Sequence, residues 1–267
     1  MAQSQSSHRS GFVHAHRDPI RIVPLHLPDE MLVLTDELAA AAGSPQLTYR
    51  GGQLIENVDV FTVFWGSKWQ TGANAQMVTK INDFFKFLVA SELITQMTEY
   101  SVPKFQIGKG TFHGTATITT PALHGSVSDS AIQHMLQQEI ASNSAFPQPT
   151  PNLLYFVYTQ PGVAIVQGGS RSCTAFCGYH DNVSGQIFYA AMPYPGCSGC
   201  TGGLSTLDAL TSTSSHEFCE AITDPIPGTG WYDDTNGEIG DICAWKTKKL
   251  GSYTVQLEWS NKANKCV

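Results

Sequence analysis

The sequence predicts an α/β fold of the α+β kind, in which helices pack against a mixed sheet. Short runs rich in β-branched and aromatic residues alternate with longer stretches whose apolar residues recur at helical spacing. The first pattern is typical of buried strands and the second of amphipathic helices. Their alternation indicates a sheet covered by helices. A chain of 267 residues with 42% hydrophobic side chains can bury a sizeable core.

The elements can be placed by their apolar patterns. Strands are expected at 58–66, 111–120, 153–159, 187–192 and 253–259, and helices at 73–98, 128–142 and 204–223. The last helix must end near Asp224, because a residue that precedes proline avoids the α conformation, and Pro225 follows.

The chain divides into a tail and a compact domain. Residues 1–46 are polar and weakly patterned, so we expect a flexible tail or pro-segment, in which only 31–42 suits a short helix. Residues 47–267 are expected to form a single domain.

Composition excludes some classes of function. The net charge of −7 argues against a nucleic-acid partner, which normally requires a basic patch. No run of about 18 apolar residues occurs, so no membrane span is expected. The N-terminus has no apolar h-region and is not a signal peptide as written, so the protein is either intracellular or has lost a leader. The oligomeric state is left open.

All seven cysteines follow residue 170. Two close pairs, Cys173 with Cys177 and Cys197 with Cys200, are expected to form disulfides, although four thiolates can also bind zinc. Cysteines among Gly, Pro and Ser favour structural disulfides in an exported protein. The odd count leaves one thiol unpaired, and Cys219 is the candidate because it lies within a predicted helix.

The sequence HEFCE at 216–220 carries the strongest chemical signal. Residues four apart share a helix face, so His216 and Glu220 lie side by side as two zinc ligands. Glu217 is rotated about 100° away from His216. It can instead accept a proton from a water on the metal, as the glutamate of H-E-x-x-H does.

A third ligand is expected in the acidic loop downstream. Asp241 is favoured and Glu238 is a close rival, because one helical turn would align residues three apart. A disulfide between Cys243 and Cys266 would fix this loop to the last strand.

Simpler interpretations of these residues remain open. The loop oxygens of Asp233, Asn236 and Glu238 suit calcium as a second, structural ion, although the full calcium-loop spacing is absent. His180, in the run CGYH at 177–180, is more typical of a turn residue than of a catalytic one. An isolated H-E-x-x-E motif can also be a solvated helix face.

Three longer runs resemble a known family: SHEFCEAITDP at 215–225, GWYD at 230–233 and GEIGDIC at 237–243. They resemble exported microbial proteins of zincin-like character and, distantly, the plant EXORDIUM (phosphate-induced) proteins. The resemblance covers roughly 48–267. It implies a single zincin-like catalytic domain with a metal-binding active-site helix, a secreted protein, and a role for His180 behind the metal ligands or in stabilising the transition state.

The motifs favour a zinc-dependent hydrolase, most simply a metallopeptidase with Glu217 as general base and a peptide or glycan substrate. His180 or Tyr232 would stabilise the oxyanion. One alternative is a non-catalytic cell-surface module that binds glycans and has a structural metal. Another is a metal-dependent hydrolase of glycans or esters, in which Trp65, Trp69, Trp231 and Trp245 line a groove. These tryptophans more often belong to a core.

Overall fold

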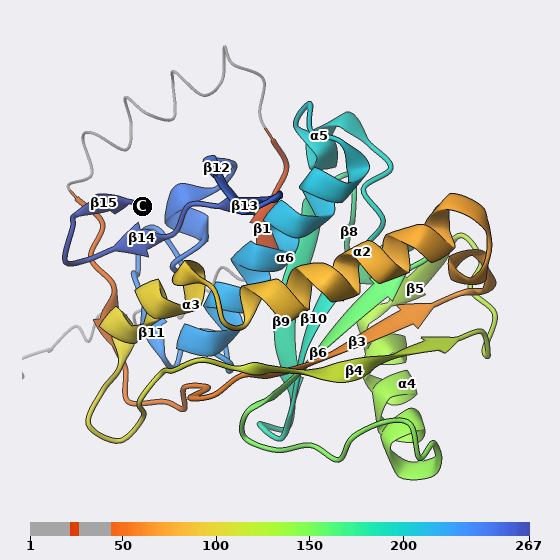
Figure 1. Cartoon of the computed structure of the whole chain (residues 1–267), viewed down its shortest axis with the longest axis horizontal. Coiled ribbons are helices and arrows are strands. Elements are labelled where there is room, and N and C mark those ends of the chain that lie inside the picture. Colours follow the sequence, from red (N-terminus) through yellow and green to blue (C-terminus); the bar gives the residue numbers. More distant parts are fainter. Residues whose placement is uncertain (1–21, 27–43) are drawn as a thin grey trace, which may run out of the picture.

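The structure, a computed structural model, describes residues 22–26 and 44–267. Its centre is a six-stranded sheet with the order β1-β9-β10-β6-β3-β4 (Figure 1). The strands are β1 (Ile22–Pro24), β9 (Phe176–Val183), β10 (Ile187–Met192), β6 (Leu153–Thr159), β3 (Asp59–Trp65) and β4 (Thr111–Ile118). Strands β10, β6, β3 and β4 are parallel, whereas β9 is antiparallel to β10 and β1 is antiparallel to β9. The predicted α+β class with a mixed sheet is confirmed.

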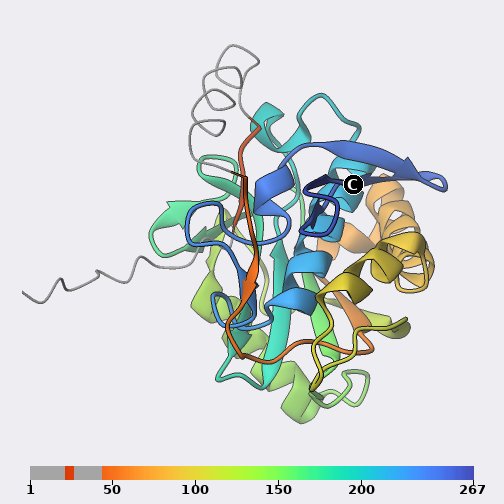
Figure 2. The ribbon, with the colours of Figure 1, turned by 90° about the vertical axis from the view of Figure 1, so that its left-hand side faces the viewer.

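Helices cover both faces of this sheet. Helices α2 (Gly72–Leu88) and α6 (Thr206–Thr223) lie on one face and α4 (Asp129–Ser142) on the other (Figures 1 and 2). Two further helices, α3 (Glu92–Met97) and α5 (Ser198–Thr201), are short. Within the described ranges, no helix is long and apolar enough to cross a membrane.

Short elements complete the described chain. The strands are β2 (Thr48–Tyr49), β5 (Ser126–Ser128), β7 (Ala164–Gln167), β8 (Ser170–Arg171), β11 (Trp231–Tyr232), β12 (Thr247–Leu250), β13 (Tyr253–Gln256), β14 (Trp259–Ser260) and β15 (Lys265–Cys266). The 3₁₀ helices are η1 (Ser67–Gln70), η2 (Thr98–Tyr100) and η3 (Asp241–Cys243).

Successive residues of the central strands point to opposite faces of the sheet and form two separate cores. Phe64 and Phe156 point to the α2–α6 face, where Phe85 of α2 packs 4.5 Å from Phe156 between ring centroids. Tyr155 and Val157 point to the other face and pack with residues of α4. Burial of apolar surface on both sides explains why β3 and β6 are continuous apolar runs.

Two predicted elements are shorter in the structure. The helix expected at 73–98 is interrupted after Leu88, because Ser91 is extended and its side chain accepts a hydrogen bond from the Leu93 amide as the N-cap of α3. The strand expected at 253–259 ends at Gln256, and β14 follows separately.

Strand β9 was not predicted. The run 177–180 was expected as a turn, and that expectation was wrong, because Tyr179 and His180 pair with β10, and Gly178 and Tyr179 pair with β1. Polar residues hide the strand in the sequence, since His180 is buried here among charged side chains rather than apolar ones.

Part of the expected tail belongs to the sheet. Ile22, Val23 and Pro24 form the edge strand β1, so these residues are not a free tail. The short helix expected at 31–42 lies outside the described residues. The division into a tail of 1–46 and one domain of 47–267 otherwise stays a prediction.

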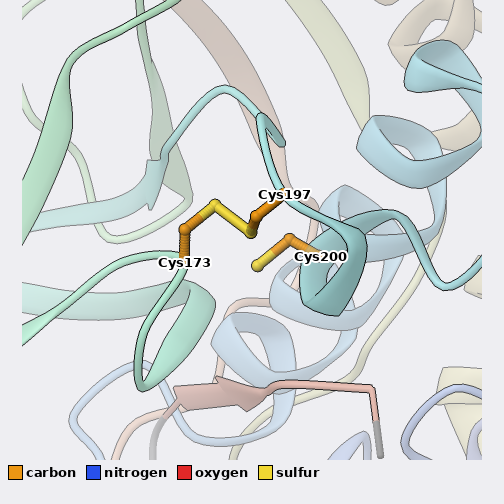
Figure 3. Close-up of side chains that lie close together, drawn as sticks. All are labelled: Cys173, Cys197 and Cys200. Carbon is orange, nitrogen blue, oxygen red and sulfur yellow. A yellow bond between two sulfur atoms is a disulfide. The ribbon is translucent and has the colours of Figure 1, made fainter. Parts of the chain in front are cut away.

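Three disulfides are formed, but two of them join different partners from those predicted. Cys173 bonds Cys197 and Cys177 bonds Cys200, so both bonds connect the start of β9 to the loop and short helix around α5. Figure 3 shows the Cys173–Cys197 bond with the Cys200 side chain beside it. The close pairs expected from the sequence were wrong, because the chain reverses between β9 and α5 and brings distant cysteines together. The bonded sulfurs also exclude a four-thiolate zinc site.

Two predictions about cysteines are confirmed. Cys243 bonds Cys266, with Cα atoms 5.8 Å apart. Cys219 is buried in α6 as a free thiol. Burial raises the pKa of this thiol well above its usual range, so it stays protonated and unreactive.

Candidate metal centre

Helix α6 carries polar residues into the interior of the protein. Its Ser205 N-cap accepts a hydrogen bond from the Asp208 amide, and the helix is buried from Ala209 to Thr223. The buried hydroxyls are satisfied by neighbouring strands: Tyr158 of β6 bonds Ser214, and Ser215 accepts the Gln256 amide of β13. These bonds fix the rotation of the helix and therefore the direction of the acidic and histidine side chains that follow.

Three side chains converge beside this helix. His216 Nε2 lies 2.9 Å from Glu220 Oε1 and 3.9 Å from Asp241 Oδ1. Candidate ligand atoms of all three residues lie within 4.8 Å of one another. The helix therefore brings His216 and Glu220 together as expected from their spacing, and η3 supplies Asp241 as the third group.

The hydrogen bonding of this group fits a metal site. Both ring nitrogens of His216, Glu220 Oε2 and Asp241 Oδ1 are buried without a hydrogen-bond partner in the part of the chain that the structure describes. Buried polar atoms without a partner are costly and call for an explanation. Zinc bonds of about 2.0–2.1 Å place tetrahedral ligand atoms roughly 3.3 Å apart, a spacing that the two observed distances bracket.

Glycine at position 240 allows η3 to approach the helix. A Cβ at Gly240 would lie 2.8 Å from His216 Nδ1 and 2.9 Å from Glu220 Oε1. The Gly240 carbonyl accepts a hydrogen bond from Gln256 Nε2, and the Asp241 amide donates to Glu220 Oε1 over 3.1 Å. The loop is thus held against the helix at the position where Asp241 joins the other two groups.

Glu238, the alternative to Asp241 as third ligand, lies in a different group of side chains. Its Oε1 lies 3.5 Å from His180 Nε2, in a group formed by His180, Glu220 and Glu238. The Glu238 amide donates to Asp241 Oδ2 over 3.0 Å. A single helical turn does not align the two side chains, because the 3₁₀ turn begins only at Asp241.

His180 lies at the centre of the buried carboxylates. Its Nδ1 lies 3.1 Å from Glu217 Oε2, and its Nε2 lies 3.1 Å from the Asp224 carbonyl oxygen. Since both acceptors suit an N–H donor, both ring nitrogens are engaged, and the ring fits an imidazolium better than a metal ligand. Glu217 Oε1 is left buried without a partner among the described residues.

Burial and charge act in opposite directions on these groups. Burial lowers the pKa of His180, but hydrogen bonds with Glu217 and Glu220 outweigh it and raise that pKa to about 10. Burial raises the pKa of Glu217. For Glu220, burial is outweighed by His216 and His180, which lower the pKa to about 2. Glu220 is therefore the most firmly ionised carboxylate of the cluster.

Two buried carboxylates were not predicted. Asp224 accepts hydrogen bonds from the amides of Gly228, Thr229 and Gly230, which folds the chain back after α6. The position of an Asp between a helix end and Pro225 was a usable signal for such a role. Glu258 is fully buried with neither carboxylate oxygen bonded within the described chain. No pattern in its neighbourhood marks it.

The other sequence candidates lie elsewhere. Asp233 accepts hydrogen bonds from the amides of Thr235 and Asn236 and so closes its own turn. Glu238 faces His180 instead. These residues therefore do not form a set of calcium ligands. The Tyr232 ring packs under the Arg50 guanidinium, 4.4 Å from it.

The four tryptophans do not form one surface. Trp65 and Trp69 are core residues whose indole N–H groups donate to the carbonyls of Pro121 and Tyr158. Trp231 donates to the Tyr100 carbonyl, and Trp245 packs near β1.

The Cys243–Cys266 bond is expected to support the candidate ligand Asp241 as well as the fold. It closes a chain segment of nearly the same length as the Cys173–Cys197 bond, with sequence separations of 23 and 24. Changing Cys243 and Cys266 to alanine should lower the free energy of unfolding by about 3 kcal/mol. Changing Cys173 and Cys197 should lower it less, because the Cys177–Cys200 bond still closes nearly the same segment. Only the Cys243→Ala/Cys266→Ala variant should also weaken zinc binding, by about tenfold. Denaturant unfolding and competitive zinc titration of both variants measure this, and equal zinc affinities would contradict it.

The metal-free protein should lose stability as the pH rises. The folded-state pKa of His180 is raised from 6.5 to about 10, so its contribution is complete below pH 6.5 and lost as the pH rises through 10. Burial raises the pKa values of Glu238 and Asp241, which acts in the same direction. Glu220, with its pKa lowered to about 2, acts oppositely and only at acid pH. Urea unfolding in chelator at pH 6 and pH 9 measures the difference, which His180→Gln should reduce.

No family model matches the chain, and no curated protein matches it. Functional inference therefore rests on the residues and their geometry.

Proposed function

We propose that this protein is a zinc-dependent hydrolase of the metallopeptidase type, built on a zincin-like fold. His216, Glu220 and Asp241 would hold the ion. The observation that carries the proposal is the convergence of these three side chains, buried and with ligand atoms that lack hydrogen-bond partners in the described chain. One imidazole and two carboxylates suit zinc, and three protein ligands leave one coordination position open, as in catalytic sites.

The chemistry assigned to the chain's own residues is proton transfer. Bound zinc supplies Lewis-acid chemistry, which acidifies water and polarises a carbonyl group. Glu217 Oε1 has no partner among the described residues and takes the proton from water, then delivers it to the leaving nitrogen. Burial raises the pKa of Glu217, which suits a base that must also act as an acid near neutral pH.

His180 is assigned a positioning role in this scheme. Its Nδ1–H donates to Glu217 Oε2, which directs the other carboxylate oxygen, Oε1, away from the histidine. Its Nε2–H donates to the Asp224 carbonyl at the end of α6, so the ring is held at both nitrogens. The histidine therefore acts through Glu217 rather than on the substrate.

The three disulfides fit an exported protein, and we propose that the protein is secreted. The resemblance to exported zincin-like proteins and to the EXORDIUM family agrees with this and is part of the same proposal.

Anomalous diffraction at the zinc edge tests the metal centre. One strong peak between His216, Glu220 and Asp241 is the expected result. His216→Ala should abolish zinc binding, whereas His124→Ala, at an exposed histidine, should not. Zinc at 100 times its Kd should raise the free energy of unfolding by about 2.7 kcal/mol. A protein that binds no zinc in these experiments has a different function.

One observation favours a second candidate, a structural metal in a non-catalytic module. His180 is 1% exposed, and Glu217 and Glu220 are 0% exposed. A closed site with four protein ligands would have this character. The same diffraction experiment separates the two candidates by the number of protein ligands around the peak.

A further inference from the structure

Three parallel strands end level with one another at one edge of the central sheet. Trp65, the last residue of β3, pairs with Ile118 at the end of β4 and with Thr159 at the end of β6 (Figure 1). The chain leaves β3 toward α2 on one face of the sheet and leaves β4 toward α4 on the opposite face. Such divergence of neighbouring loops opens a crevice outside the carboxyl ends of parallel strands, where α/β proteins commonly bind their ligands.

A cavity occupies this crevice. Its volume is about 340 Å³, within the roughly 300–1,000 Å³ that is usual for small-molecule sites. The loops that follow β3, β4 and β6 all line it, and the polar side chains of the lining are Ser67, Lys68, Thr119, His124 and Gln160. None of the described residues that line it belongs to the candidate metal centre, so the cavity is a separate site.

One buried side chain holds the three loops together. Gln160 is 7% exposed. Its Oε1 accepts a hydrogen bond from the Lys68 amide over 3.0 Å, and its Nε2 donates to the Leu123 carbonyl over 3.2 Å. Gly66 permits this arrangement, because its φ is +125° and a Cβ there would overlap the Gln160 side chain. The cavity is therefore formed before a ligand enters, which reduces the ordering cost of binding.

The loops around the cavity are basic in an acidic protein. The segments 66–72, 119–128 and 160–172 contain no Asp or Glu, although the whole chain has 22 acidic and 15 basic residues. The basic and histidine side chains of these segments are Lys68, His124 and Arg171. This distribution favours an anion at the crevice, because a cleft lined by one sign of charge concentrates ligands of the opposite sign.

Lys68 is free to bind such an anion. Its Nζ donates to the Pro161 carbonyl over 2.9 Å, and no carboxylate in the described ranges pairs with it. An ammonium group has three N–H donors, so two remain for a ligand. Arg171 also pairs with no described carboxylate, and its guanidinium donates to the carbonyl of Gly125, which lines the cavity, over 3.4 Å.

We propose that this cavity binds a small organic anion, with its charged oxygens on Lys68 and its carbon skeleton against Leu123 and Val163. Carboxylate and phosphate groups share the oxyanion chemistry that a lysine recognises. Leu123 and Val163 supply apolar surface beside the lysine. The anion site is additional to the proposed hydrolase and does not depend on it.

Three ligands with the same ring test the proposal. Phenyl phosphate, benzoate and neutral benzamide are titrated into the full-length protein, and amide chemical shifts report binding. Because carboxylates and phosphates also bind zinc, the titrations are repeated with the His216→Ala variant. Both anions should produce saturable shifts in the loops that follow β3, β4 and β6. Benzamide should bind at least about tenfold more weakly, because it cannot form a charged hydrogen bond with the lysine.

Lys68→Ala should weaken the binding of both anions by about tenfold. Lys80→Ala, at an exposed lysine of α2, is the matched control and should leave their affinities unchanged. Raising the NaCl concentration from about 0.05 M to about 0.5 M should weaken binding to the parent protein, because salt screens the attraction between the anion and the lysine.

The outcomes separate the anion site from the hydrolase. Tighter binding of phenyl phosphate or of benzoate supports the site in either case and identifies the charged group that it prefers. The site is overturned if the three loops show no saturable shifts, if benzamide binds as tightly as the anions, or if Lys68→Ala binds them as the parent does. None of these measurements depends on zinc or on hydrolysis, so failure of the anion site leaves the proposed function standing, and failure of zinc binding leaves the anion site standing.

Discussion

Glu217→Gln should reduce hydrolysis by at least about 10²–10⁴-fold while zinc stays bound. Glutamine has the same shape and can still receive the His180 Nδ1 hydrogen bond through its side-chain oxygen. It cannot accept a proton, so only proton transfer is removed. The change should also lower the free energy of unfolding, because it removes the negative charge that pairs with buried His180. Turnover with a peptide library and zinc content by mass spectrometry measure the two effects.

Glu258→Gln is the matched control for this experiment. Glu258 is also fully buried, and neither of its oxygens has a hydrogen-bond partner in the described ranges. It lies between β13 and β14, its amide donates to the Val267 carbonyl, and it belongs to neither the His216–Glu220–Asp241 group nor the His180–Glu220–Glu238 group. Burial raises the pKa of Glu258 well above its usual range, so the side chain is already uncharged and glutamine changes no charge beside the candidate ligands. Activity and zinc content should therefore be unchanged. Full activity of Glu217→Gln with zinc bound would remove Glu217 from the role of base.

The helical part of the candidate site could be predicted because it depends on one local period. His216 and Glu220 lie on one face of any helix, and the strong apolar and capping signals placed α6 correctly to within two residues. The sequence could not decide whether Asp241 or Glu238 is the third candidate ligand. That choice depends on where a 3₁₀ turn begins and on a contact between the Asp241 amide and Glu220. Neither feature produces a periodic pattern in the sequence.

The remaining features depend on contacts between distant segments. His180 was hidden because a strand that lines a polar centre does not alternate between apolar and polar residues. The disulfide partners of Cys173 and Cys177 are set by the return of the chain from β10 to α5, which spacing alone does not encode. The pairing of Ile22 with Tyr179 likewise crosses most of the chain. In each case a contact between segments that are far apart in the sequence decides the structure.

Gly240→Ala should weaken zinc binding by about 10- to 100-fold, which is the effect usual for groups that support metal ligands. The backbone at this position, with φ −80° and ψ −37°, accepts any residue, so no strain arises from the conformation itself. The added methyl group would instead lie 2.8 Å from His216 and 2.9 Å from Glu220. Either η3 retreats and carries Asp241 away, or the two helix side chains turn from their convergent positions.

Gly196→Ala separates this steric effect from a general effect of glycine replacement. Its nearest neighbour would be the Tyr194 carbonyl oxygen at 3.9 Å, an ordinary contact, so zinc affinity should not change. Competitive titration with a chromophoric chelator compares both variants with the parent protein. If Gly240→Ala binds zinc as tightly as the parent, then His216, Glu220 and Asp241 do not form the ligand set. If it binds weakly but unfolds normally in chelator, the glycine is retained for the metal, because the fold alone would accept alanine there.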